Sequence, residues 1–96
     1  MRRKNTQALG DVIQRYLEAL DIDDKLKEVR LVKSWESVVG KMISNKTKKI
    51  YIKDKKLFVY LNSSIARNEI SMVKDDLVKR LNQEAGGEII EDIVLR

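Results

Sequence analysis

Lys46 to Asn62 reads KTKKIYIKDKKLFVYLN, and this stretch decides the fold of the chain. Aliphatic residues alternate with lysines and aromatic residues on both sides of Asp54-Lys55-Lys56. Alternation with a period of two around a short polar break predicts a β-hairpin. The stretch holds six lysines against one aspartate, a net charge of +5 that equals the net charge of the whole chain. The sequence therefore predicts an otherwise neutral protein that carries one basic hairpin.

The alternation gives the predicted hairpin two different faces, because successive side chains of a strand point to opposite sides. The aliphatic face is expected to anchor the core, and it consists of Ile50, Ile52, Leu57, Val59 and Leu61. The opposite face carries Lys49, Tyr51, Lys53, Phe58 and Tyr60.

Two amphipathic helices are predicted before the hairpin. The first covers Leu9 to Leu20, where apolar residues recur at helical spacing, and Asp21 to Asp24 interrupt it. The second runs from Lys25 into the Met42 region. Trp35 lies on its apolar stripe, and we expect this large aromatic residue to be a core anchor. Gly40 falls inside the same pattern, where a glycine indicates close packing, a kink or an early stop.

A third helix and a third strand are predicted after the hairpin. Asn62-Ser63-Ser64 is a cluster of helix N-cap residues, so a helix is expected over Ile65 to Glu84, with Gly86 as its left-handed C-cap. Glu88 to Leu95 is short and rich in β-branched residues, which predicts a strand parallel to the second one. The element order predicts an α+β fold, a three-stranded mixed sheet with helices packed on one face.

Length and composition narrow the range of functions. Ninety-six residues make one small domain, taken as residues 7–96 behind a flexible basic terminus, residues 1–6. The chain has no cysteine and no histidine, so we expect no enzyme, no metal site and no cofactor. No apolar run reaches the length of a membrane span, and the basic start lacks the apolar part of a secretory signal, so a cytoplasmic protein is expected.

The lysines of the hairpin are the main functional signal. Ammonium groups displace counterions from a phosphate backbone, and aromatic rings between them stack on bases. The expected stacking residues are Tyr51, Phe58 and Tyr60. Phosphate contacts are expected from the following hairpin residues: Lys46, Lys48, Lys49, Lys53, Lys55 and Lys56. Arg67 and Lys74 are expected to support them from the third helix.

Two other interpretations of the hairpin stay open. Lysines on an edge hairpin protect a sheet against aggregation, which needs no ligand. Alternatively, the aromatic residues of the hairpin form one apolar patch with Ile90 and Val94, which are predicted to lie on the same side of the sheet. Such a patch would dock a partner protein, or a second copy of the chain, without contacting nucleic acid.

A succession of short motifs resembles one known family. These motifs are Trp35-Glu36-Ser37-Val38-Val39-Gly40, Thr47, Leu57-Phe58-Val59-Tyr60-Leu61, Asn62-Ser63-Ser64, Arg67-Asn68-Glu69 and Leu81-Asn82. In this order, over nearly the whole chain from Leu9 to Arg96, they resemble the DciA-like family, also catalogued as domain of unknown function 721. The resemblance implies a bacterial K-homology-like domain that binds DNA, contacts the replicative helicase and assists its loading.

Parts of the family pattern do not transfer to this chain. Some relatives carry a zinc ribbon, but this chain has no cysteine. Well-studied relatives have a long disordered tail, whereas this sequence is expected to act as a short single-domain member. The GxxG loop with which K-homology domains clamp single strands is absent. Binding to single- or double-stranded DNA, or to RNA, is therefore expected to depend on charge and stacking, with low sequence specificity and a steep dependence on salt.

Overall fold

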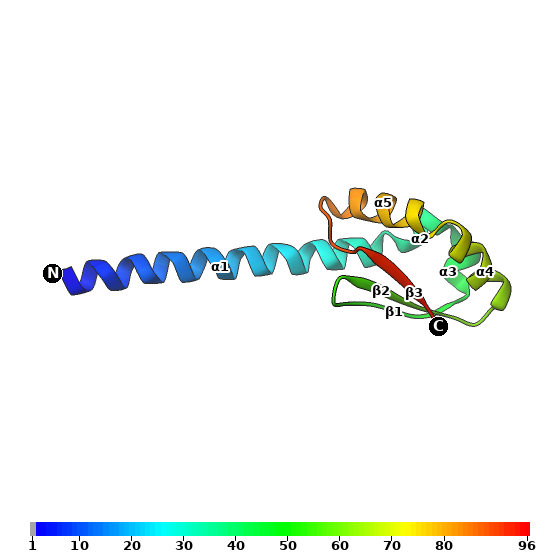
Figure 1. Ribbon diagram of the computed structural model, residues 1–96, viewed down its shortest axis with the longest axis horizontal. Helices are drawn as coiled ribbons and strands as arrows, with labels where there is room; N and C mark the ends of the chain where they lie inside the picture. Colours follow the sequence, from blue (N-terminus) through cyan, green and yellow to red (C-terminus); the bar gives the residue numbers. More distant parts are fainter. Residues whose placement is uncertain (1) are drawn as a thin grey trace.

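The computed structural model describes residues 2–96, with side chains from residue 10 onward. Eight elements follow in order: α1 (Arg2–Lys33), α2 (Trp35–Val39), α3 (Lys41–Asn45), β1 (Thr47–Lys53), β2 (Lys56–Leu61), α4 (Ser64–Met72), α5 (Lys74–Ala85) and β3 (Asp92–Leu95). The helices lie on one side of a three-stranded sheet, and no described helix covers the other side (Figure 1). This arrangement confirms the predicted α+β fold, whereas the likeness to K-homology domains stays a prediction.

The sheet has the strand order β1-β2-β3. β1 pairs with β2 in the antiparallel direction, and β2 pairs with β3 in the parallel direction, as the crossover through α4 and α5 predicts. Asp54 and Lys55 form the two-residue turn of the hairpin, with φ angles of 51° and 60°. Two consecutive left-handed residues give a turn whose twist matches that of the flanking strands.

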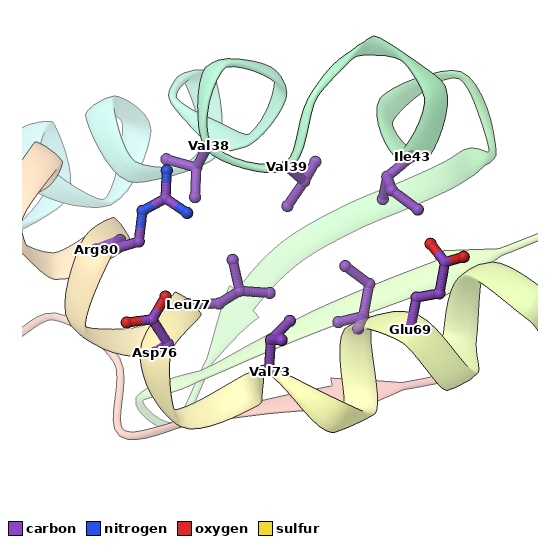
Figure 2. Close-up of a pocket in the computed structure, with 9 residues that line it drawn as sticks. Val38, Val39, Ile43, Glu69, Val73, Asp76, Leu77 and Arg80 are labelled. Atoms are coloured by element: carbon purple, nitrogen blue, oxygen red, sulfur yellow. The ribbon is translucent and has the colours of Figure 1, made fainter.

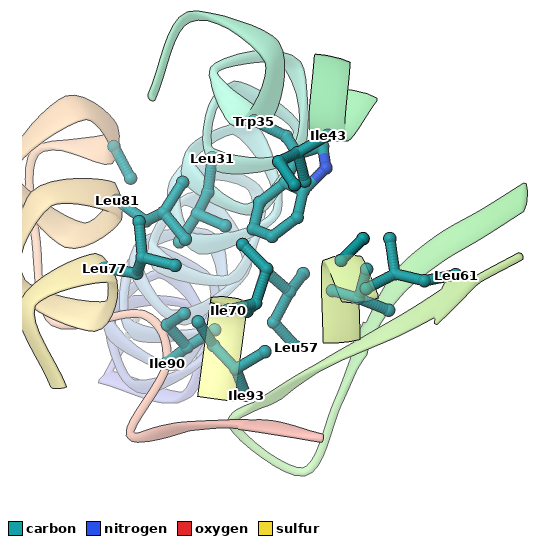
Figure 3. Close-up of a cluster of buried hydrophobic side chains, with 13 residues drawn as sticks. Leu31, Trp35, Ile43, Leu57, Leu61, Ile70, Leu77, Leu81, Ile90 and Ile93 are labelled. Atoms are coloured by element: carbon teal, nitrogen blue, oxygen red, sulfur yellow. The ribbon is translucent and has the colours of Figure 1, made fainter. Parts of the chain in front are cut away.

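The aliphatic side of the hairpin lies against the helices, as the alternation predicts. Leu57 and Val59 are completely buried, and Leu61 is 4% exposed. Figure 3 shows Leu57 and Leu61 in one cluster with Leu31 from α1 and Leu81 from α5. The remaining members of the cluster are Trp35, Ile43, Ala66, Ile70, Leu77, Ala85, Ile90 and Ile93.

Trp35 joins three elements around one edge of this core. Its side chain is 3% exposed, and its indole Nε1 donates a hydrogen bond to Thr47 Oγ1 on β1 at 3.0 Å. The Thr47 hydroxyl in turn donates to the backbone carbonyl of Ile43 on α3, also at 3.0 Å. The polar atom of a buried aromatic side chain normally finds such a partner, and here the partner fixes the start of the hairpin against the helices.

α1 is continuous through the segment where the sequence predicts an interruption, Asp21 to Asp24. Lys25 Nζ lies 3.2 Å from Asp21 Oδ2, and Lys27 Nζ lies 3.1 Å from Asp23 Oδ2. Ion pairs between residues four apart stabilise a helix, so these aspartates continue the helix and do not cap a new one. The second helix was predicted to run from Lys25 to the Met42 region, and its predicted start is therefore wrong.

The N-terminal half of α1 projects away from the sheet and gives the molecule principal extents of 67 × 20 × 18 Å (Figure 1). The predicted flexible arm, residues 1–6, begins at Met1, which lies outside the described residues. The rest of that arm is described only as the backbone of α1. Although α1 has 32 residues, neither it nor any other described helix is apolar enough over a sufficient length to cross a membrane.

The remaining helices are shorter than predicted because particular residues stop them. Gly40 ends α2 with a φ of 92°, a conformation that favours glycine. The predicted third helix, Ile65 to Glu84, is divided at Val73, whose φ of −121° is not helical. Its predicted ends are confirmed, because the Ser63 hydroxyl accepts a hydrogen bond from the Ala66 amide and Gly86 adopts the left-handed conformation.

The third strand is shorter than the predicted Glu88 to Leu95, and it begins only at Asp92. Asn82 Oδ1 accepts hydrogen bonds from the amides of Ile89 and Ile90, both at 3.1 Å, and Asn82 Nδ2 donates to the Ile90 carbonyl at 2.9 Å. These hydrogen bonds satisfy the backbone polar groups of Ile89 and Ile90, which in a longer strand would have bonded to the neighbouring strand. Ile90 is therefore 3% exposed in the core, and its predicted place beside the hairpin aromatics is wrong.

Candidate nucleic-acid interface

The open face of the sheet is the side opposite the helices. The register of the strands shows which of its residues lie beside one another. Its central cross-strand row is Tyr51, Phe58 and Val94. The row beside the hairpin turn is Lys53, Lys56 and Asp92. The row toward the other end contains Lys49 and Tyr60, and Arg96 follows two residues after Val94. Hydrophobic and cationic side chains therefore share one surface.

Three aromatic rings on the open face form a ladder. The ring centroids of Tyr51 and Phe58 are 5.1 Å apart with an interplanar angle of 9°, and those of Tyr51 and Tyr60 are 6.2 Å apart with an angle of 24°. Lys49 Nζ lies 5.2 Å from the Tyr51 centroid and 5.7 Å from the Tyr60 centroid, within range of a cation–π interaction. Tyr51 is thus the middle ring, and Phe58 and Tyr60 are the ends of the ladder.

The Tyr51 phenol has a raised pKa, so it is harder to ionise than an ordinary tyrosine. Hydrogen bonding with the Tyr60 side chain, and then desolvation, raise the pKa of Tyr51 above the ordinary value for tyrosine, while Arg96 acts in the opposite direction. A neutral ring beside lysines adds no negative charge that would repel a phosphate.

The six predicted phosphate-binding lysines are all exposed, but they occupy different places. Lys49, Lys53 and Lys56 lie on the open face with the aromatic ladder. Lys55 is in the hairpin turn, Lys46 caps the end of α3, and Lys48 lies where the β1–β2 register shifts. Three of the six lysines therefore share one surface with the rings.

The two predicted supporting cations both have partners inside the chain. Arg67 Nη1 donates to the Leu61 carbonyl at 2.7 Å and lies 3.5 Å from the Arg96 carbonyl, so it ties together the ends of β2 and β3. Lys74 Nζ lies 3.3 Å from Asp92 Oδ1 at the start of β3. Arg96 was not among the sequence-predicted residues, although the period of two that places Val94 on the open face also extends to position 96.

A hollow lies among the short helices, on the other side of the molecule from the open face (Figure 2). It has a volume of about 310 Å³ and an apolar floor that includes Val39, Ile43 and Leu77. Glu69, Asp76 and Arg80 complete its lining, and the mixture of charges selects no ligand class. Within the described part of the chain, no three acidic side chains come together in a way that could hold a metal ion.

Comparison with known proteins identifies the family. The family model DciA, described as Dna[CI] antecedent, matches residues 8–95. A UPF0232 protein of Corynebacterium glutamicum (strain R) is 23% identical over 90 residues, which cover 94% of this chain and 51% of the relative. The chain thus spans about half the length of that relative, and no solved structure matches it. Because the family model extends from the projecting helix to the last strand, this chain belongs to the DciA family, which is associated with loading of the bacterial replicative helicase.

Proposed function

We propose that the chain binds nucleic acid through the open face of its sheet and acts as an accessory protein of the replicative helicase. The observation that carries this proposal is the ladder of Phe58, Tyr51 and Tyr60 with Lys49 over it. Aromatic rings stack on any base, and nearby cations neutralise phosphates, so this combination binds without sequence preference. The helicase role rests on membership of the DciA family.

Single-stranded nucleic acid fits this face better than a duplex does. The bases of a duplex are already stacked on each other, whereas an unpaired base is free to stack on a protein ring. Tyr51 is enclosed between two other rings, so the ends of the ladder, Phe58 and Tyr60, are the expected stacking positions. They are two residues apart on β2, which places both along the path of one strand.

The lysines next to the turn support a phosphate site at one end of the ladder. Lys53 and Lys56 are direct cross-strand partners, and like charges in that position destabilise a sheet. Asp92 pairs with Lys56 in the same row, but its carboxylate is already paired with Lys74. A phosphate between the Lys53 and Lys56 ammonium groups would relieve the remaining repulsion. Lys49 lies toward the opposite end of the open face and would bind the next phosphates along the nucleic-acid strand.

A salt titration of DNA binding tests the proposal. For duplex DNA, the slope of log affinity against log salt is about 0.9 per phosphate neutralised, and for single strands it is about 0.7. Replacing Lys49, Lys53 and Lys56 together by glutamine should lower the single-strand slope by about 2 and weaken binding. The matched control replaces three exposed lysines that lie outside the open face, Lys33, Lys41 and Lys79. Equal effects of the two triple variants would contradict the proposed site.

A pull-down with the replicative helicase separates the two parts of the proposal. The variant Phe58→Ala/Tyr60→Ala should lose affinity for single-stranded DNA because both ends of the ladder are removed. If it keeps DNA affinity and loses only the helicase, the rings dock a protein, and the alternative interpretation of the hairpin replaces the nucleic-acid one.

A further inference from the structure

The outer edge of β1 has no neighbouring strand within the described part of the chain, because the sheet ends there. In a hairpin with a two-residue turn, the residues that flank the turn hydrogen-bond to each other, and bonded and non-bonded pairs then alternate along the strands. Lys53 and Tyr51 are therefore bonded to β2, whereas the N–H and C=O groups of Ile50 and Ile52 point toward the free edge. These backbone groups are available to a further strand.

A groove runs along this edge, between β1 and α1. Its volume is about 570 Å³, larger than that of the hollow among the short helices. Its aliphatic lining comes from both elements, with Val29 and Val32 on α1 and Ile50 and Ile52 on β1. On the same side of the sheet, Leu57 of β2 is completely buried, whereas Ile50 and Ile52 are only partly buried. The helices thus cover the centre of the sheet and leave the inner side of β1 partly open.

We propose that an extended acidic peptide of a partner protein binds in this groove as a fourth strand beside β1. The inference does not rest on nucleic-acid binding. Because side chains of a strand alternate between its two faces, the groove determines the pattern of such a peptide. Its inner side chains would lie beside Ile50 and Ile52 and have to be apolar. Its outer side chains would lie beside Lys49 and Lys53, where opposite charges on neighbouring strands stabilise the sheet.

The charges on the α1 wall of the groove agree with this pattern. Lys25, Glu28 and Lys33 line that wall, and Lys25 Nζ already lies 3.2 Å from Asp21 Oδ2. The remaining carboxylate and lysine leave the wall nearly neutral, which suits the apolar side chains of the peptide. Glu28 would repel a phosphate backbone lying in the groove. A peptide strand therefore fits this groove better than a nucleic-acid strand does.

A second copy of the chain fits the edge less well than an acidic peptide. If two β1 strands paired in the antiparallel direction about Tyr51, Lys49 of each copy would lie opposite Lys53 of the other. Like charges directly opposite each other destabilise a sheet. The lysines therefore disfavour pairing between copies, which is a usual role of lysine at a sheet edge, and they favour a strand of opposite charge.

Binding of a synthetic peptide to the full chain tests the groove. The probe has the length of β1, blocked ends and alternating glutamate and valine, and the control peptide has the same composition with its valines placed together. Fluorescence anisotropy should show binding of the alternating peptide and much weaker binding of the control. Failure of the alternating peptide to bind, or equal binding of the two peptides, would overturn the proposal.

A pair of identical substitutions on α1 tests the position of the peptide. Val29 is 52% exposed, so Val29→Glu should leave the chain folded, but it places a charge against the apolar side of the peptide. It should raise the peptide dissociation constant roughly tenfold or more. Val12→Glu is the matched control on the projecting part of the same helix, where the valine is 61% exposed, and it should have little effect. Equal effects of the two substitutions would place the peptide outside the groove.

Amide hydrogen exchange followed by NMR tests the added strand itself. The alternating peptide should slow exchange of the Ile50 and Ile52 amides roughly tenfold or more, because these amides gain hydrogen bonds. The Tyr51 amide, which already bonds to β2, should change much less. Three outcomes would overturn the proposal: equal slowing at all three amides, slowing by a single-stranded oligonucleotide in place of the peptide, and slowing on concentration of the chain alone, which would indicate a second copy.

Discussion

The two faces of β2 differ although they belong to the same six residues. Leu57 and Val59 point into the helices and are completely buried, whereas Phe58 and Tyr60 alternate with them on the open face and are half-buried. The helices need an aliphatic surface to pack against, which explains the inner face. Nothing in that packing requires large rings or lysines on the outer face. Function, and not packing, can therefore determine which side chains occupy the outer face.

This difference predicts that substitutions on the two faces have separate effects. Changes on the inner face should lower the free energy of unfolding, because they leave a cavity in a close-packed core. Changes on the open face should affect binding more than stability. Substitutions in β2 and its turn test whether the two faces are separate in this way.

The largest expected effect on stability comes from the inner face. Leu57→Ala should lower the free energy of unfolding by about 2–5 kcal/mol, because it removes a fully buried side chain from between the helices and the sheet. Urea denaturation followed by circular dichroism measures this change. Phe58→Ala on the adjacent position should lower the free energy of unfolding by less, about 1–2 kcal/mol, because a half-buried ring and its stacking on Tyr51 are lost. Equal losses would mean that both faces of the sheet belong to the core.

The next largest effect is expected on binding. Phe58→Ala and Tyr60→Ala should each weaken binding to a single-stranded oligonucleotide by about 1–3 kcal/mol, the usual contribution of one stacked base. Fluorescence anisotropy of a labelled oligonucleotide measures the affinity. Val94→Ala is the control, since Val94 lies in register beside Phe58 on the same face but has no ring. If Val94→Ala weakens binding as much, general apolar contact and not stacking holds the ligand.

The separation of the two faces was predictable from the sequence, because it depends only on alternation within the hairpin. The position of Ile90 was not predictable in this way. Its burial depends on hydrogen bonds from Asn82, a side chain on another element. Arg96, in contrast, was predictable from the sequence. The alternation that places Val94 on the open face also places residue 96 there, but the predicted strand ended at Leu95.

The continuity of α1 shows another limit of local patterns. The aspartates from Asp21 to Asp24 fit a helix cap and also fit ion pairs four residues apart, and the sequence alone favours neither. In the structure the ion pairs to Lys25 and Lys27 prevail. This choice directs the N-terminal half of the helix away from the sheet, so that its apolar stripe contributes nothing to the core.

A smaller effect is expected at the hairpin turn, and its sign is opposite. Lys55 has a φ of 60°, where a side chain costs about 1 kcal/mol relative to glycine. Lys55→Gly should therefore raise the free energy of unfolding by up to about 1 kcal/mol, measured by urea denaturation. Because Lys55 lies in the turn and not on the open face, the salt dependence of DNA binding should hardly change. A fall in the single-strand salt slope by about 0.7, the share of one phosphate contact, would extend the binding site to the turn.

The smallest effect is expected from pH. The chain has no histidine, and a neighbouring hydroxyl raises the pKa of Tyr51, so this phenol loses its proton only at more alkaline pH than an ordinary tyrosine. DNA affinity should therefore stay constant within about twofold between about pH 6 and about pH 8. At strongly alkaline pH, phenolate on the open face would place negative charge beside Lys49 and weaken binding. A large change already near neutral pH would show that the ligand depends on a group outside the open face, because no side chain on that face has an ordinary pKa in this range.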